Sequence, residues 1–410
     1  MSTETKIALI HKLDNIITIC LFLYTLTFLS DIKINFLTTA AAFGIIKLFF
    51  VRPQIQINTK LFYLIAIFLF FTFIPIFLND AASFTSYNLT EYKSRFISPL
   101  IGMLIIFLFE FTKKRITILL SGFALTLFAN AVYLIYQVIS SSTILFRPVG
   151  FASTYMLLGA VFLLILPIIF TLALSKTKLN PKLRLFFALT IFVNIPAVIL
   201  ANTRIAYIGI AVSFIISIFI GLKNKKQSLS LLIVLSLYAF TIFHFAPTSG
   251  ERLESISDTS YENQSNSERI LMWQSAIKMF EDHPIFGVGV GNYHDQYMNK
   301  YRSPLSRENS WHPHNSFLTM LSESGIFGAL SFLALFIYLY YSVIKNFFKT
   351  KNPYYLAYLS CLIAYSINLL TDSMFCGHYL KSPTTIFWLF TGIYLILNKQ
   401  ISYIQNYNDK

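Results

Sequence analysis

The chain has 410 residues, of which 56% are hydrophobic and only 12% are charged. Soluble domains carry about 25% charged residues, so this composition excludes a water-soluble enzyme of several domains and indicates an integral membrane protein. The net charge of +14 would fit nucleic-acid binding in a soluble protein, but a basic excess in a membrane protein usually marks cytoplasmic loops.

Twelve stretches are apolar and long enough to be membrane spans, since a helix needs roughly 20 apolar residues to cross about 30 Å of hydrocarbon. In chain order they cover residues 13–30, 32–50, 61–78, 96–112, 116–139, 152–175, 185–202, 204–222, 228–246, 314–344, 354–371 and 382–398. We therefore predict an all-α polytopic membrane protein with about 12 transmembrane helices. Residues 1–246 would hold the first nine helices, residues 247–313 one large outer loop containing helices, and residues 314–410 the last three.

The basic residues favour one orientation of this chain in the membrane. With the N-terminus on the cytoplasmic side, 20 of the 32 Lys and Arg residues fall on that side and 6 fall in short outer loops. Cytoplasmic loops are rich in Lys and Arg, so both termini are predicted to be cytoplasmic. The cytoplasmic bases are dispersed over seven segments, which argues against a nucleic-acid partner. The first stretch lacks a small-residue cleavage site and is interpreted as a retained span.

The large outer loop is polar, with nine acidic and six basic residues, and part of it has helical periodicity. Its apolar residues recur at Ile270, Trp273, Ile277 and Phe280. We predict a helix that is capped by Asn266 or Ser267 and ends at His283-Pro284. Arg269 would then lie in the first turn, where unpaired backbone N–H groups favour an anion. Alternatively, this helix lies on the membrane and Arg269 is a solvated charge.

Two further motifs follow in the same loop. The stretch Gly287-Val288-Gly289-Val290-Gly291 lacks the spacing of a dinucleotide fingerprint and is interpreted as a flexible turn. The loop ends in Trp311-His312-Pro313-His314-Asn315. Three interpretations of these histidines remain open: interfacial residues without chemistry, half of a metal site, or a general base, since imidazole takes a proton near neutral pH. A metal site would need further ligands, and the sequence places no companion cluster nearby.

A few charged residues lie at the outer ends of spans. An Arg at membrane depth costs at least about 2.5–3.5 kcal/mol, so such residues are functional candidates. Arg204 ends a tight Asn202-Thr203-Arg204 turn between two spans, and its alternative role is that of an interface anchor. Arg147 lies in another outer loop. Asp372 and Glu323 are interpreted as mainly structural acids that could pair with an outer arginine.

These motifs resemble the bacterial O-antigen ligase family, within the wider group of Wzy-like membrane glycan ligases and polymerases. The strongest match is His314-Asn315 followed, after nine residues, by Gly325 and then Gly328. Arg204 matches the Thr-Arg motif of the family. The residues that match its second arginine motif are Arg269, Trp273, Ala276, Pro284 and Gly287. The layout of spans and outer loop also fits, although the first 140 residues match only as hydrophobic spans.

The resemblance implies a glycosyltransferase of lipopolysaccharide biosynthesis in the bacterial inner membrane, with its active site at the periplasmic face. It would move a glycan from undecaprenyl diphosphate to a sugar hydroxyl of lipid A–core, inverting the anomeric centre without a metal or other cofactor. His314 would be the general base, with His312 as its rival, and Arg204 and Arg269 would stabilise the departing diphosphate. The expected substrate-binding residues are Arg147, Asn315, His312 and Trp273.

Other functions remain open at this stage. An O-antigen polymerase would use the same donor, but two large outer loops would favour it and this chain has one. A protein O-oligosaccharyltransferase would be a longer chain. A transporter or flippase would carry charges buried in the middle of its spans. A non-catalytic scaffold would leave the outward arginine and histidine motifs unexplained.

Overall fold

The computed structural model describes residues 3–30, 35–51, 58–108, 110, 112–141, 147–175, 179–376 and 381–408. Every regular element in these ranges is helical, and none of these residues forms a strand. The predicted all-α fold is therefore confirmed. The helices that make up the main bundle are α1 (Thr3–Thr27), α2 (Phe36–Leu48), α3 (Thr59–Phe73), α6 (Ile101–Leu108), α7 (Lys113–Ser140), α8 (Tyr155–Leu174), α9 (Pro181–Leu200), α10 (Arg204–Gly221), α11 (Lys225–Phe245), α15 (Ser316–Thr350), α16 (Pro353–Leu369) and α17 (Lys381–Asn408).

Among the described helices, eight are long and apolar enough to cross a membrane. The chain is therefore a multi-pass membrane protein by length and composition, and the predicted count of twelve is not confirmed. Two of the remaining apolar helices are short, namely α2 and the apolar part of α17 (Ser382–Leu397). The predicted span 96–112 is interrupted, because a π-helical turn (Lys93–Ile97) and a 3₁₀ turn (Ser98–Leu100) precede α6.

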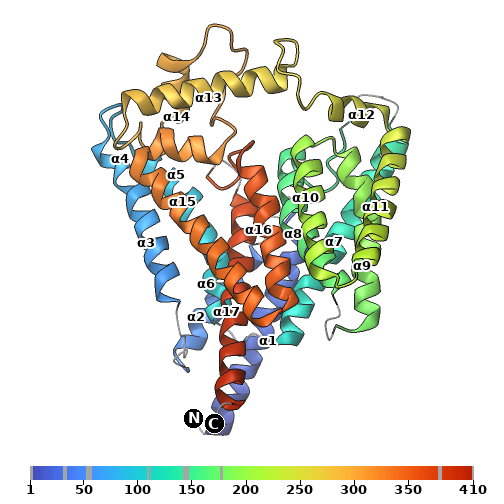
Figure 1. Cartoon of the computed structure of the whole chain (residues 1–410). Coiled ribbons are helices and arrows are strands. Elements are labelled where there is room, and N and C mark those ends of the chain that lie inside the picture. Colours follow the sequence, from blue (N-terminus) through green and yellow to red (C-terminus); the bar gives the residue numbers. More distant parts are fainter. Residues whose placement is uncertain are drawn as a thin grey trace.

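The bundle is built around α8, in which 83% of the residues in the most apolar 18-residue stretch are buried. A helix that is apolar on every side can be covered by neighbours on every side, and α8 contacts α16, α10 and α9. To one side, α15 packs against α3 and α16, and α17 packs against α6 (Figure 1). In the corresponding stretch of α11 only 6% of the residues are buried, so most of this helix lies on the surface of the bundle.

The predicted outer loop forms a separate layer across one end of the bundle (Figure 1). Its helices are α12 (Pro247–Glu254), α13 (Gln264–Asp282) and α14 (Tyr293–Gln296), followed by a π-helical turn (Tyr297–Tyr301). α13 lies across the ends of the spans, and the two ends of the chain lie together at the opposite end of the molecule (Figure 1). Two short helices, α4 (Pro75–Leu78) and α5 (Ser86–Tyr92), lie at the same end of the bundle (Figure 1). The segment between them contacts this layer through Asp80 and His283.

The start of α13 corrects one prediction. Its N-cap is Asn263, three residues before the expected Asn266. The Asn266 side chain instead donates hydrogen bonds to the backbone oxygens of Ser255 and Asp258, at 3.1 and 2.6 Å. The helix therefore begins earlier than predicted, at Gln264. Arg269 lies in its second turn, beyond the unpaired backbone N–H groups of the first turn. The predicted end at His283 is confirmed.

The turn after α13 is packed tightly against a kink in α15. Gly325 has φ of 64° and ψ of −165° inside α15, and Gly287 has φ of 61°. A Cβ on Gly325 would lie 2.2 Å from the Ile285 carbonyl oxygen, and one on Gly287 would lie 2.4 Å from that of Ser322. The Val288 N–H donates to the Ser322 oxygen at 2.8 Å. We call this contact of Gly287 against Gly325 the glycine clasp. The predicted turn is present, and both glycines are buried.

A buried ion cluster lies next to the glycine clasp. Arg95 donates to Glu91 at 2.7 Å and to Glu323 at 2.8 Å, and the other oxygen of Glu323 accepts the Gly291 N–H at 3.1 Å. The Arg95 and Glu323 side chains are 3% and 0% exposed. Glu323 therefore pairs with an arginine, as predicted. The cluster joins α15 to the segment after α5. Separating the two would leave a buried charge without its partner, which would strongly destabilise the fold.

Candidate active site

The predicted histidine motif lies at the start of α15, where the outer layer meets the bundle. Asn315 is the N-cap of α15, and its side-chain oxygen accepts the N–H groups of Phe317 and Leu318 at 2.9 and 3.0 Å. Its side-chain nitrogen donates to the Leu370 oxygen at 2.9 Å. Asn315 is thus committed to fixing the end of α15 and joining it to the turn after α16.

His314 has a backbone conformation that is unusual for a residue with a side chain. Its φ is +50°, in the left-handed region, where non-glycine residues are uncommon. Asn202, in the predicted turn before Arg204, has φ of +53°. Such backbone conformations cost about 1–3 kcal/mol and cluster at functional sites, because the surrounding structure must impose them. Both residues lie in motifs that the sequence singled out.

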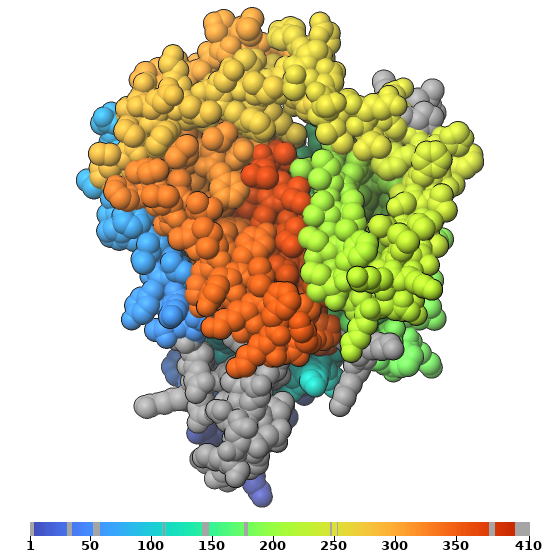
Figure 2. Space-filling view, in the orientation of Figure 1, coloured from blue at the N-terminus to red at the C-terminus, as the bar shows by residue number. Residues whose placement is uncertain are grey.

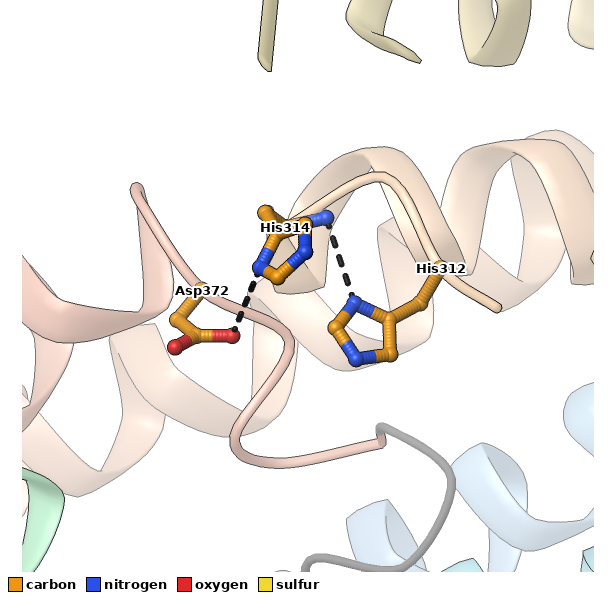
Figure 3. Close-up of side chains that lie close together, drawn as sticks. All are labelled: His312, His314 and Asp372. Atoms are coloured by element: carbon orange, nitrogen blue, oxygen red, sulfur yellow. Dashed lines mark hydrogen bonds and ion pairs between the residues drawn. The ribbon is translucent and has the colours of Figure 1, made fainter. Parts of the chain in front are cut away.

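Three side chains meet at this point (Figure 3). Nδ1 of His314 lies 3.4 Å from a carboxylate oxygen of Asp372. The two residues are 19% and 5% exposed at the side chain. Nδ1 of His312 accepts the backbone N–H of His314 at 3.4 Å, and the two imidazole rings are 4.4 Å apart. The prediction that Asp372 pairs with an arginine is therefore wrong in its choice of partner, since His314 occupies that place.

Electrostatics favour an ionised Asp372. Burial acts to raise the pKa of this carboxyl, but the His314 side chain and the charges of His312 and Arg269 outweigh burial and lower the pKa. Asp372 can therefore stabilise a positive charge on the neighbouring imidazole.

The same three side chains also form a possible metal-binding group. One ligand atom from each of His312, His314 and Asp372 lies within 4.8 Å of the others. Three protein ligands and one open position are typical of catalytic zinc sites. The companion ligand that the sequence did not reveal is thus present in the fold. The expectation of a metal-free reaction rests on the family resemblance, and the geometry leaves a cation site as an alternative.

A cavity of about 640 Å³ opens beside the histidines. Its lining includes both histidines, Arg147 and Arg269. Figure 2 shows a hollow between the outer layer and the ends of the bundle helices. Arg269 forms no hydrogen bond or ion pair with any other residue that the structure describes, so its guanidinium group can bind an anion in the cavity. The fold thus brings four of the predicted site residues together.

Arg147 is held against the turn that carries the Thr-Arg motif. Its guanidinium group donates to the Asn202 backbone oxygen at 2.7 Å and lies 3.6 Å from the centre of the Tyr155 ring. A cation over an aromatic face is attracted by the ring quadrupole. Arg147 therefore links its own loop to the turn before Arg204, although the two are about 55 residues apart in the sequence.

Arg204 itself contacts the segment that leads into α13. It donates to the Ser255 backbone oxygen at 2.8 Å and to the Ser265 hydroxyl at 2.7 Å. It is not among the residues that line the 640 Å³ cavity. The sequence ranked Arg204 above Arg147, whereas in the structure it is Arg147 that lines the cavity with the histidines.

The remaining predicted residue, Trp273, lies on α13 one turn after Arg269 and is half-buried. It is not among the residues that line the cavity. Sequence reasoning gave Asp372 no part in the chemistry. The signal that could have identified Asp372 is its position as an isolated acid after a span on the same outer face as the histidines.

Comparison with known families adds a further observation. Residues 187–333 match a family described as O-Antigen ligase. This range includes Arg204, Arg269 and His314, but neither Arg147 nor Asp372. No curated protein matches the chain.

Proposed function

We propose that this chain is the ligase that attaches a lipid-linked glycan to lipopolysaccharide, because residues 187–333 match the O-antigen ligase family. The donor is a glycan on undecaprenyl diphosphate and the acceptor is a sugar hydroxyl of lipid A–core. The reaction takes place at the periplasmic face of the inner membrane. The observation that carries the proposal is the cavity in which two histidines lie beside two arginines.

His314 is the general base in this proposal. Asp372 faces Nδ1 of its ring, which favours the tautomer with hydrogen on Nδ1 and leaves Nε2 free to accept a proton. In His312 the situation is reversed, because Nδ1 accepts a backbone N–H and the hydrogen of the neutral ring is on Nε2. His312 is therefore the better donor and His314 the better base.

The reaction is a single displacement. The acceptor hydroxyl oxygen bonds to the anomeric carbon as the carbon–oxygen bond to the diphosphate breaks. The hydroxyl proton moves to Nε2 of His314, and Asp372 stabilises the imidazolium ion. The diphosphate leaves with the bonding electron pair, and attack opposite to the leaving group inverts the anomeric centre. A positioned base of this kind contributes typically about 10²–10⁴-fold to the rate.

The arginines compensate the charge that develops on the leaving group. Arg269 and Arg147 line the cavity and can present their N–H groups to the phosphate oxygens, for which a guanidinium fork is well matched. We assign Arg204 the role of ordering the segment at Ser255 and Ser265 that leads into α13, next to the diphosphate. Fixed cations at the leaving group act as electrostatic transition-state stabilisers.

Reconstitution of the purified protein with lipid-linked glycan and lipid A–core tests the proposal. Capped lipopolysaccharide is the expected product, while longer lipid-linked chains and an unmodified core would identify a polymerase. The variants His314→Ala, Arg269→Ala and Arg204→Ala should each abolish transfer while the protein still inserts into the membrane. Full activity of His314→Ala would reject the assignment of the base.

A further inference from the structure

The cavity contains an aromatic surface that the reaction scheme does not use. Trp311 is 43% exposed and lines the cavity directly next to the histidine motif. Its ring is stacked on that of His294, with the ring centres 3.9 Å apart and the planes at 8°. An exposed tryptophan ring that is stacked on a second ring offers flat apolar surface to a ligand.

The support beneath Trp311 is rigid. Nδ1 of His294 lies 3.0 Å from the Ser310 backbone oxygen, and His294 belongs to α14. The neighbouring α14 residue Tyr293 is fully buried in a second hydrophobic core with Met272 and Met279 of α13. The indole ring is therefore held by an element that is anchored to the outer layer, as a preformed binding surface requires.

The chain on the other side of Trp311 is fixed as well. The Ser310 hydroxyl donates to the His312 backbone oxygen at 2.6 Å, across Trp311. Trp311 and His314 are three residues apart, so their Cα atoms are separated by at most about 11 Å. A ring stacked on Trp311 would thus lie within about one or two sugar units of the proposed base.

Polar groups suited to hydroxyls line the same cavity as the indole. The cavity lining includes Gln264, Glu308 and Asn309, and the Gln264 amide donates to Glu308 at 2.9 Å. Amides donate and accept, and carboxylates accept, the hydrogen bonds that sugar hydroxyls need. A pyranose has an apolar C–H face and a polar edge, and its C–H groups are attracted by the negative face of an aromatic ring.

Resting on the proposed function, we propose that Trp311, supported by His294, is the platform on which a pyranose ring of the transferred or accepting glycan stacks during the reaction. Trp311 is a substrate-positioning residue in this view. The sugar ring comes either from the donor glycan or from the acceptor core, and the two sources are distinguished by which substrate loses affinity.

Steady-state kinetics with donor and acceptor varied separately provide the first test. We expect Trp311→Ala to raise the KM of one substrate about tenfold, with kcat within about twofold of wild type, because the lost contact serves binding. Trp311→Phe should keep the KM within about threefold of wild type, since a ring remains. Tyr261→Ala is the control: Tyr261 is a comparably exposed aromatic residue of the outer layer, 49% exposed, outside the cavity lining.

A binding titration provides a second test that needs no transfer. The probe is the free oligosaccharide released from the lipid-linked donor or from the core by acid hydrolysis. One of these should change the tryptophan fluorescence of the wild type and of Tyr261→Ala, but not that of Trp311→Phe. The platform is rejected if both KM values of Trp311→Ala stay within about twofold of wild type, or if Trp311→Phe keeps the fluorescence change. Binding that depends on Trp311 without any transfer by the wild type would reject the proposed function alone.

Discussion

The contact between His314 and Asp372 leads to a prediction whose magnitude can be worked out. Asp372→Asn keeps the shape of the side chain but removes its charge. At 3.4 Å and an effective dielectric constant of about 20, the full Coulomb attraction between imidazolium and carboxylate would be about 5 kcal/mol. Desolvation of the buried carboxylate opposes this attraction, so we take the net contribution of this charged contact to be about 1.5–3 kcal/mol. We therefore expect kcat to fall roughly 10- to 150-fold.

The imidazolium exists only after the proton has moved, so the loss should be in kcat, with little change in either KM. The assay is the initial rate of lipopolysaccharide capping in proteoliposomes, measured while one substrate is varied and the other is saturating. Asp80→Asn is a matched control, because Asp80 pairs with His283 at 2.6 Å in the outer layer and neither residue lines the cavity. A kcat within about twofold of wild type for Asp372→Asn, or a raised KM with unchanged kcat, would refute the reasoning.

Three further predictions concern ionisation, metal and backbone. The pKa of Asp372 is lowered in the folded protein. The ionised carboxylate therefore stabilises the fold above its ordinary pKa of about 3.9, and this stabilisation is lost as the pH falls through the folded-state pKa. The difference in Tm between wild type and Asp372→Asn should be constant above about pH 5 and should shrink below about pH 4. EDTA should leave the rate of capping unchanged if His314 is a base, whereas loss of activity that is restored by zinc would support the cation site. Gly325→Ala should lower the Tm and the yield of folded protein, because its Cβ would meet the Ile285 oxygen at 2.2 Å, while Gly250→Ala, whose Cβ would have its nearest neighbour at 3.9 Å, should have little effect.

The helical fold could be predicted because long apolar stretches have few alternatives in a membrane. Where the prediction failed, local interactions decided the outcome. The side chain of Asn266 bonds to the preceding loop, so it does not cap α13. The π and 3₁₀ turns before α6 divide what looked like one continuous span, and no periodicity in an apolar stretch reveals such a break.

The candidate site was predictable only where its residues lie in compact motifs. His314 and Asn315 are adjacent in sequence, and the pattern of residues around them indicates the site. The partner of Asp372 depends on how the turn after α16 packs against α15, which the sequence does not reveal. The same holds for Arg147 and Arg204, since the guanidinium group of each donates hydrogen bonds to residues about 50 or more positions away.

The buried cluster around Arg95 has a consequence for the biogenesis of the protein. Arg95 and Glu323 are 228 residues apart in the sequence. Arg95 is therefore synthesised and delivered to the membrane long before Glu323 is made. Until α15 arrives, Glu91 is the nearer counter-charge, four residues away on the same segment. We therefore expect the segment around Arg95 to reach its final depth only when α15, which carries Glu323, is in place. Truncated chains that end before residue 323 should remain more sensitive to membrane proteases than the complete protein, because an incompletely paired charge opposes burial.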